Sequence, residues 1–111
     1  MLIEVFYVSG CPNHQPAVRR LRKVLRLQAV NVSVHEIPVT DDLAARALRF
    51  PGSPTVRIDG VDAEPVEQQS SGLTCRRYSG SDRVPSEEIL QRAISIAKER
   101  RGNAGRNQRT S

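Results

Sequence analysis

Four short stretches of the chain carry the pattern of β-strands. Each is rich in β-branched or aromatic side chains and is bounded by turn residues. Apolar and polar positions alternate most clearly in the second stretch, which predicts a strand that is buried on one side. The predicted strands are residues 2–8, 30–37, 55–59 and 72–78, the last of them at an edge of the sheet.

The connections near the third predicted strand also have a clear pattern. Asp59–Gly60, directly after it, is a tight-turn signal. Residues 61–71 are polar and turn-prone, so we expect an exposed loop there, and a second loop is expected over residues 79–85.

Three other stretches repeat their apolar side chains at helical spacing. Pro12 fits the first turn of the first predicted helix, because its missing N–H would be unpaired there in any case. Thr40 and Ser86 are the expected caps of the second and third helices. The predicted inner faces are Ala17, Val18, Leu21, Val24, Leu25 and Gln28 in the first helix, Leu43, Ala44, Ala47 and Leu48 in the second, and Ile89, Leu90, Ala93, Ile94 and Ala97 in the third.

The order of these elements, β-α-β-α-β-β-α, predicts an α/β fold. A βαβ unit opens the chain and a hairpin followed by a helix closes it, which favours one four-stranded mixed sheet flanked by three helices. At 111 residues the chain has the length of one domain. We expect this domain over residues 1–97 and a basic, disordered tail over residues 98–111, whose composition cannot bury apolar surface.

The net charge of +5 is concentrated in that tail. Residues 1–97 carry a net charge of +1 and residues 98–111 a net charge of +4. The basic side chains of the first predicted helix fall largely on its polar faces, where we expect them to be solvated. Neither basic segment contains an aromatic side chain that could stack on a base, so a nucleic-acid partner is not expected.

Two features bear on the compartment. No apolar run approaches the ~18 residues of a membrane span, so no membrane partner is expected. The first six residues include Glu4 and lack a basic region, so they are predicted to be a strand and not a signal peptide. A cytoplasmic location is the resulting expectation. Cys11 and Cys75 are too few and too far apart to predict a disulfide framework.

Cys11 is the strongest candidate for chemistry. It follows the first predicted strand at the expected start of the first helix, where backbone N–H groups and the helix dipole favour a thiolate. His14 lies three residues later, so its ring can share a helical face with Cys11. An imidazolium would stabilise the thiolate, and a neutral ring could act as a base or metal ligand. The alternative is an exposed cysteine without special reactivity.

Two motifs, Gly10-Cys11-Pro12-Asn13-His14 and Gly52-Ser53-Pro54-Thr55, together resemble the thioredoxin-like family over residues 1–97. Members of this family place a reactive cysteine after strand one and a cis-proline just before strand three, in contact with that cysteine. The resemblance implies a thioredoxin-like fold with Cys11 and His14 as catalytic residues. It also implies a cis Ser53–Pro54 bond and substrate binding by Ser53, Pro54 and Thr55. A trans proline that ends a loop is the alternative interpretation of Pro54.

The second cysteine of the family's Cys-x-x-Cys motif is absent, because His14 occupies its position. A dithiol cycle is therefore not expected, and the chain resembles the monothiol, glutaredoxin-like members. We expect thiol–disulfide or thiol–adduct chemistry by Cys11, with protein or small-molecule thiols and disulfides as partners and no cofactor. Whether the domain is an enzyme stays open, and a non-catalytic interaction domain with the same fold is an alternative.

Gly10-Cys11-Pro12-Asn13-His14 and Gly72-Leu73-Thr74-Cys75-Arg76 also resemble a group of small bacterial proteins, some with labels linked to mercury resistance or alkylmercury lyase. This resemblance implies a further alternative, in which Cys11 binds a soft metal ion such as Hg(II) or Cu(I) together with His14 or Cys75. Cleavage of organomercurials needs paired cysteines with a nearby acid, and the sequence has no such cluster.

The role of Cys75 is open. Strand geometry places it about 10 Å from the end of the fourth predicted strand, so a direct disulfide with Cys11 is marginal. Cys75 is interpreted as a buried structural thiol, a distant resolving thiol or a second soft-metal ligand.

Overall fold

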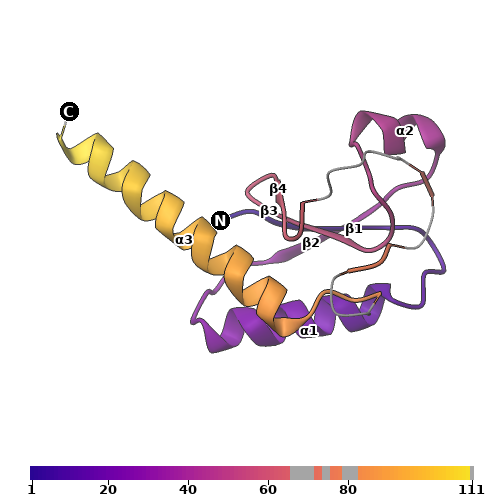
Figure 1. The fold of residues 1–111 in the computed structure, drawn as a ribbon, viewed down its shortest axis with the longest axis horizontal. Helices are drawn as coiled ribbons and strands as arrows, with labels where there is room; N and C mark the ends of the chain where they lie inside the picture. The colour runs from indigo at the N-terminus through magenta and orange to yellow at the C-terminus, as the bar shows by residue number, and fades with distance from the viewer. Residues whose placement is uncertain (66–71, 74–75, 79–82, 111) are drawn as a thin grey trace.

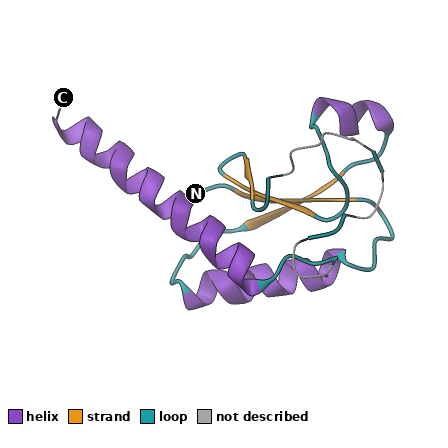
Figure 2. Ribbon diagram, viewed as in Figure 1, coloured by secondary structure: helices purple, strands orange, loops and turns teal. Residues whose placement is uncertain are grey.

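The computed structural model describes residues 1–65, 72–73, 76–78 and 83–110 of the chain. Within them, strands and helices follow the predicted order β-α-β-α-β-β-α (Figure 1). Figure 2 shows the helices lying around a single small sheet. The elements are β1 (Ile3–Tyr7), α1 (His14–Leu27), β2 (Val34–Pro38), α2 (Asp42–Ala47), β3 (Thr55–Ile58), β4 (Val61–Asp62) and α3 (Glu87–Thr110).

The four strands form one mixed sheet in the order β2-β1-β3-β4. β1 and β2 are parallel, with Val5 opposite Glu36, and α1 is the crossover that a parallel pair requires. β3 pairs antiparallel with the other side of β1, with Ile58 opposite Ile3, and β4 pairs antiparallel with β3. The predicted α/β fold with a four-stranded mixed sheet and three helices is therefore confirmed.

The core has two parts because successive side chains of β1 point to opposite faces of the sheet. Ile3 and Val5 pack with α1 and α3 on one face, in a cluster whose buried members from the helices are Val18, Leu21, Val24, Leu25, Leu90, Ile94 and Ala97. Phe6 points to the other face and packs with Val39, Ala45 and Phe50, next to α2. Figure 1 shows α1 and α3 on one side of the sheet and α2 on the other.

The predicted buried faces hold for α1 and α3 but not for α2, whose buried residue is Ala45, while Leu43 is 77% exposed and Ala47 is also exposed. α1 buries Ala17, Val18, Leu21, Val24 and Leu25, as its apolar spacing predicts. The predicted helix ends also differ. α1 begins at His14, so Pro12 lies before its first turn and not within it. α2 is capped by Asp41, whose carboxylate accepts from the Ala44 N–H at 2.7 Å, and not by Thr40. Ser86 caps α3 as predicted, with its Oγ accepting from the Ile89 N–H at 3.1 Å.

The sequence prediction was wrong about the position of the fourth strand. The strand is Val61–Asp62, inside the stretch predicted as an exposed loop, and the described residues of 72–78 form no strand. Asp59 and Gly60 both have positive φ, 53° and 81°, which is the conformation of a two-residue hairpin turn. The chain therefore turns back at once and pairs with β3. Residues 66–71, 74–75 and 79–82 lie outside the described part of the chain.

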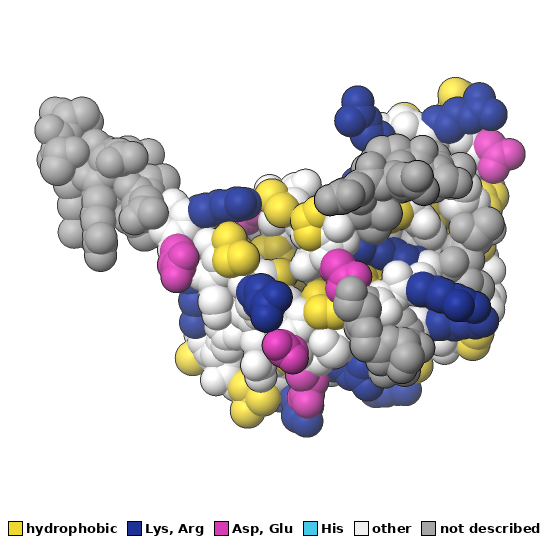
Figure 3. Space-filling view, in the orientation of Figure 1, with side chains coloured by type: hydrophobic (Ala, Val, Ile, Leu, Met, Phe, Trp, Pro, Cys, Tyr) yellow, Lys and Arg dark blue, Asp and Glu magenta, His cyan; other side chains and the backbone are white. Residues whose placement is uncertain are grey.

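α3 continues to Thr110, so the backbone is helical in the range where the sequence predicts a disordered tail. Figure 1 shows its last turns extending beyond the sheet. The charged side chains on the face seen in Figure 3 are spread over the surface, with basic and acidic groups interspersed. No helix in the described ranges has the length and apolar character needed to cross a membrane.

Candidate thiol site

Cys11 lies in the turn that joins β1 to α1. Its N–H donates to the Val8 carbonyl at 3.0 Å, and its own carbonyl accepts from the His14 N–H at 3.3 Å. The thiol is free and partly exposed. Cys11 thus lies two residues before the N-cap residue Asn13 and outside the helix, whereas the sequence predicts it at the helix start. The first turn of α1 contains no acidic residue that would offset the positive end of the helix.

The Ser53–Pro54 segment reaches the same turn from the start of β3. The Val8 N–H donates to the Ser53 hydroxyl at 3.0 Å, while the Val8 carbonyl accepts from Cys11. One residue at the end of β1 is therefore bonded to both predicted motifs. The Ser53–Pro54 peptide bond is cis, as the family resemblance implies.

The three residues predicted to bind substrate are buried, and their polar groups have internal partners. The Ser53 carbonyl accepts from the Arg76 N–H at 2.9 Å. The Pro54 carbonyl accepts from the Tyr78 hydroxyl at 2.6 Å. The Thr55 hydroxyl donates to the Gly52 carbonyl at 2.6 Å. These groups hold the loop in place, and direct contact with a substrate stays a prediction.

His14 is fixed by two groups that lie on neighbouring strands. Its ring stacks on Tyr7 of β1, with the centroids 3.7 Å apart and the planes 6° from parallel. Its Nε2 lies 2.7 Å from Glu36 Oε1 of β2, and the side chain is only 12% exposed. A carboxylate can only accept, so Nε2 carries the proton and Nδ1 is the acceptor of a neutral ring. Among the described groups, no hydrogen bond joins the ring to the Cys11 thiol.

Glu36 also faces the cationic side chain of Arg22. Arg22 Nη2 lies 3.7 Å from Glu36 Oε2, so the carboxylate lies between the imidazole and a guanidinium. This arrangement keeps Glu36 oriented towards α1, where its first oxygen meets His14. Because the guanidinium is 53% exposed, its contribution to the orientation is small.

The buried side chain of Arg76 also stabilises the Ser53–Pro54 loop. Arg76 is 3% exposed, and its guanidinium donates to both Asp62 oxygens, at 2.8 and 2.9 Å, and to the Glu64 carbonyl. It also donates to the Thr55 hydroxyl at 3.2 Å and lies 4.2 Å from the centre of the Tyr78 ring. The hairpin of β4 is thereby tied to the Ser53–Pro54 loop.

Burial changes the pKa values of Arg76 and Tyr78. Burial lowers the pKa of Arg76, but the hydrogen bonds to Asp62 and the neighbouring acidic charges raise it, and the pKa is raised overall. Burial also raises the pKa of Tyr78, against the opposing effect of the Arg76 charge. Both side chains therefore keep their protons, so the Arg76–Asp62 ion pair and the Tyr78 hydrogen bond persist at neutral pH.

Sequence reasoning did not find Tyr7, Glu36 or Arg76 as parts of this site. The alternation of residues 30–37 places Glu36 on the same side of its strand as Val30, Val32 and Val34, so an acidic side chain on the apolar side of the strand was the available signal of its contact. Arg76 interrupts an otherwise strand-like stretch, and that interruption was the one available signal of a buried ion pair.

The predicted metal site cannot be assembled from the described residues alone. Cys75 lies outside them, so the predicted pairing of Cys11 with Cys75, as thiols or as soft-metal ligands, stays a prediction. Within the described ranges, no group of three or more histidine, cysteine or acidic side chains could hold a metal ion.

Together these residues define an α/β domain with a partly exposed thiol in the turn after its first strand. Comparisons with protein-family models, curated proteins and solved structures find no match to the chain. The geometry of the site itself therefore carries the functional proposal.

Proposed function

We propose that this protein is a monothiol member of the thioredoxin-like proteins and that Cys11 carries out thiol–disulfide or thiol–adduct exchange. The observation that carries the proposal is the pair of hydrogen bonds at Val8, which bring the Cys11 turn and the Ser53–Pro54 loop to one point. The strand order β2-β1-β3-β4, with two helices on one face and one on the other, supports the same class.

The exchange proceeds in two balanced steps. The Cys11 thiolate attacks one sulfur of a disulfide, forms a mixed disulfide with it and expels the other sulfur as a thiolate. A second, free thiol then attacks the mixed disulfide, forms a new disulfide with the substrate sulfur and releases Cys11 as a thiolate. In this proposal the second thiol comes from solution, from the class of small thiols such as glutathione, since His14 occupies the position of the family's resolving cysteine.

His14 and Glu36 supply the proton acceptor in this proposal. The hydrogen bond to Glu36 holds the neutral ring with its proton on Nε2, which leaves the Nδ1 lone pair to take the proton of Cys11. Tyr7 keeps the ring from rotating, because the two planes are stacked. Glu36 and Tyr7 are positioning residues in this proposal, because they act through their contacts with the His14 ring.

A reducing compartment suits this chemistry. A monothiol that relies on a free thiol in solution needs that thiol to be present in reduced form, as it is in the cytoplasm. We therefore place the reaction in the cytoplasm, with protein or small-molecule disulfides as partners.

The proposal is tested by following Cys11 in the folded protein. Incubation with oxidised glutathione, read by mass spectrometry, should give one glutathione adduct in the wild type and in Cys75→Ser, and none in Cys11→Ser. Reduced glutathione should then remove the adduct. An adduct on Cys75 alone, or a Cys11 that reacts no faster in the folded than in the urea-unfolded chain, would refute the proposal.

The same variants distinguish thiol exchange from the alternative function, soft-metal binding. Titration with Hg(II) should give tight binding that is lost in both Cys11→Ser and Cys75→Ser if the two thiols share an ion. Retained exchange chemistry in Cys75→Ser, together with Hg(II) binding that is equally weak in all three proteins, would favour the monothiol function over metal binding.

A further inference from the structure

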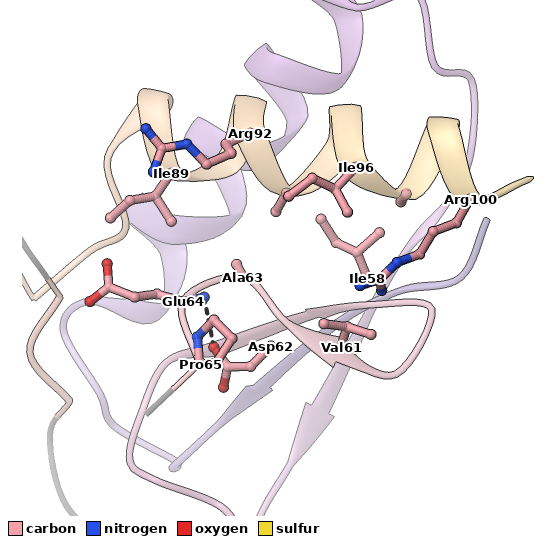
Figure 4. A pocket seen from close by; sticks show the side chains of 12 residues that line it. Ile58, Val61, Asp62, Ala63, Glu64, Pro65, Ile89, Arg92, Ile96 and Arg100 are labelled. Carbon is pink, nitrogen blue, oxygen red and sulfur yellow. Dashed lines mark hydrogen bonds between the residues drawn. The ribbon is translucent and has the colours of Figure 1, made fainter. Parts of the chain in front are cut away.

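A cavity lies between α3 and the β3–β4 hairpin, at the opposite end of β1 from Cys11. Its volume is about 280 Å³. The apolar part of its lining comes from three elements: Ile58 of β3, Val61 of β4, and Ile89 and Ile96 of α3. Figure 4 shows these side chains facing the space between the helix and the hairpin.

The apolar lining is open to solvent. Val61 is 40% exposed and Ile96 41% exposed, which is high for large aliphatic side chains that face each other across a cavity. Figure 3 shows hydrophobic side chains reaching the surface in the middle of the same face, with basic and acidic side chains around them. A volume equal to about nine water molecules, at ~30 Å³ each, has room for a small organic molecule and not for a folded partner.

The charges at the cavity are unequal at its two ends. Arg100 lines one end, and Figure 4 shows its side chain running from α3 towards Ile58 and Val61. Arg100 makes no ion pair within the described part of the chain. Asp62 also lines the cavity, but both of its oxygens are taken by buried Arg76.

The other end of the cavity is balanced. Glu64 lies there next to Ile89, and Arg92 of the same end is paired with Glu88 at 3.3 Å. The neighbouring Arg101, which does not line the cavity, lies 4.0 Å from Asp59. Among the described residues that line the cavity, Arg100 is therefore the cation without an ion pair.

We propose that this cavity binds a small amphipathic carboxylate, with its carboxylate on Arg100 and its apolar body over Ile58, Val61 and Ile96. A guanidinium matches a carboxylate with two parallel hydrogen bonds, and an aliphatic body of a few carbons would cover the exposed apolar side chains. The site is separate from Cys11 and does not depend on the thiol chemistry.

Octanoate, with about ten non-hydrogen atoms, is a suitable probe for a cavity of this size. Methyl NMR spectra of the full chain should show saturable shifts at Ile58, Val61, Ile89 and Ile96 on titration with octanoate below its micellar range. Octanol, which has the same body without the charge, should bind about tenfold more weakly.

Two exposed arginines provide a matched pair of variants. Arg100→Gln should weaken octanoate binding about tenfold and leave octanol binding unchanged. Arg101→Gln, one residue along the helix, should leave both unchanged. Equal binding of octanol and octanoate, equal effects of the two variants, shifts centred elsewhere on the protein, or no saturable shifts at all would each overturn the proposal.

Discussion

The imidazole of His14 lies flat against the ring of Tyr7, with the two centroids 3.7 Å apart. The ring belongs to the first residue of α1, and Tyr7 is the last residue of β1. The far edge of the same imidazole meets Glu36 of β2 at 2.7 Å. The start of the helix is thus attached to both strands of the parallel pair, and the turn that carries Cys11 spans the interval between Tyr7 and His14.

Glu36→Gln tests the role of this attachment. A glutamine can donate or accept, so it no longer fixes the proton on Nε2. We expect the ¹⁵N shifts of the His14 ring to show a mixture of tautomers in the variant and one tautomer in the wild type. We also expect the rate of Cys11 alkylation at neutral pH to fall by about tenfold.

Glu88→Gln is the control for that change, because the one ion pair of Glu88 among the described residues is with exposed Arg92. It should alter neither the ring shifts nor the alkylation rate. An unchanged tautomer in Glu36→Gln would show that the carboxylate does not orient the ring, whatever happens to the thiol.

Arg76→Met tests the buried ion pair. The change leaves the Asp62 carboxylate, which is 15% exposed, without its guanidinium, and this type of loss costs about 3–5 kcal/mol. Urea denaturation should show that cost as a lower midpoint. Arg76→Lys should recover only part of it, because an ammonium cannot make the paired hydrogen bonds of a guanidinium.

The double variant Arg76→Met, Asp62→Leu separates the charge from the packing. Removal of both charges should be less destabilising than Arg76→Met alone, because no uncompensated carboxylate remains. Additive costs of the two changes would contradict a coupled pair.

Gly52→Ala should be more destabilising than Gly60→Ala, although both glycines have positive φ. A Cβ at Gly52 would lie 3.0–3.1 Å from Cβ, Cα and N of Arg76, whereas a Cβ at Gly60 meets nothing within 4 Å. We expect a cost of about 1 kcal/mol at Gly60 and about 2–4 kcal/mol at Gly52. Thermal or urea unfolding of the two variants measures the difference, and equal costs would mean that the Arg76 segment can move away.

Tyr78→Phe tests the raised pKa of the Tyr78 phenol, which burial causes. The folded protein keeps this proton at pH values where an unfolded tyrosine, with a pKa of about 10, has released it. Tyr78 therefore stabilises the fold below about pH 10, and this contribution is lost as the pH rises further.

In Tyr78→Phe the alkaline loss of stability should be smaller than in the wild type, while Tyr7→Phe should keep it. At neutral pH the Phe variant should be about 1–3 kcal/mol less stable, because the buried Pro54 carbonyl loses its donor. Unfolding curves recorded between pH 7 and pH 11 give both quantities. Identical alkaline slopes in all three proteins would contradict the assignment to Tyr78.

The elements with a long repeating pattern were predictable from the sequence. The five buried side chains of α1 are those that its apolar spacing selects, and residues 30–37 overlap the observed β2, Val34–Pro38. Such patterns show which side of an element is buried, because the sheet and the helices pack by burying their apolar side chains. They do not report where an element ends, and α1 begins later than expected.

The fourth strand was missed because it is only two residues long. An alternation cannot be seen over Val61–Asp62, whereas residues 72–78 have a longer strand-like composition. The Asp59–Gly60 turn was recognised, and its hairpin geometry was the signal that the partner strand follows directly.

The contacts of the site were less predictable because they join residues that are distant in the sequence. His14 and Glu36 are 22 residues apart, and Arg76 and Asp62 are 14 apart. No periodicity connects such positions. The family resemblance implied a contact between the cysteine and the proline. The structure links the two motifs through the hydrogen bonds at Val8, and direct contact of Pro54 with Cys11 stays a prediction.

The meeting at Val8 uses only main-chain atoms of that residue. Its N–H is taken by Ser53 and its carbonyl by Cys11, so the valine side chain plays no part in the connection. For these two hydrogen bonds, any residue with a main-chain N–H would serve at position 8, and only proline would break the link. The valine side chain has a separate role, because it packs against the cluster that contains Phe6 and Phe50. A junction on which the arrangement of the thiol site depends would therefore be recorded in an alignment only as an apolar position.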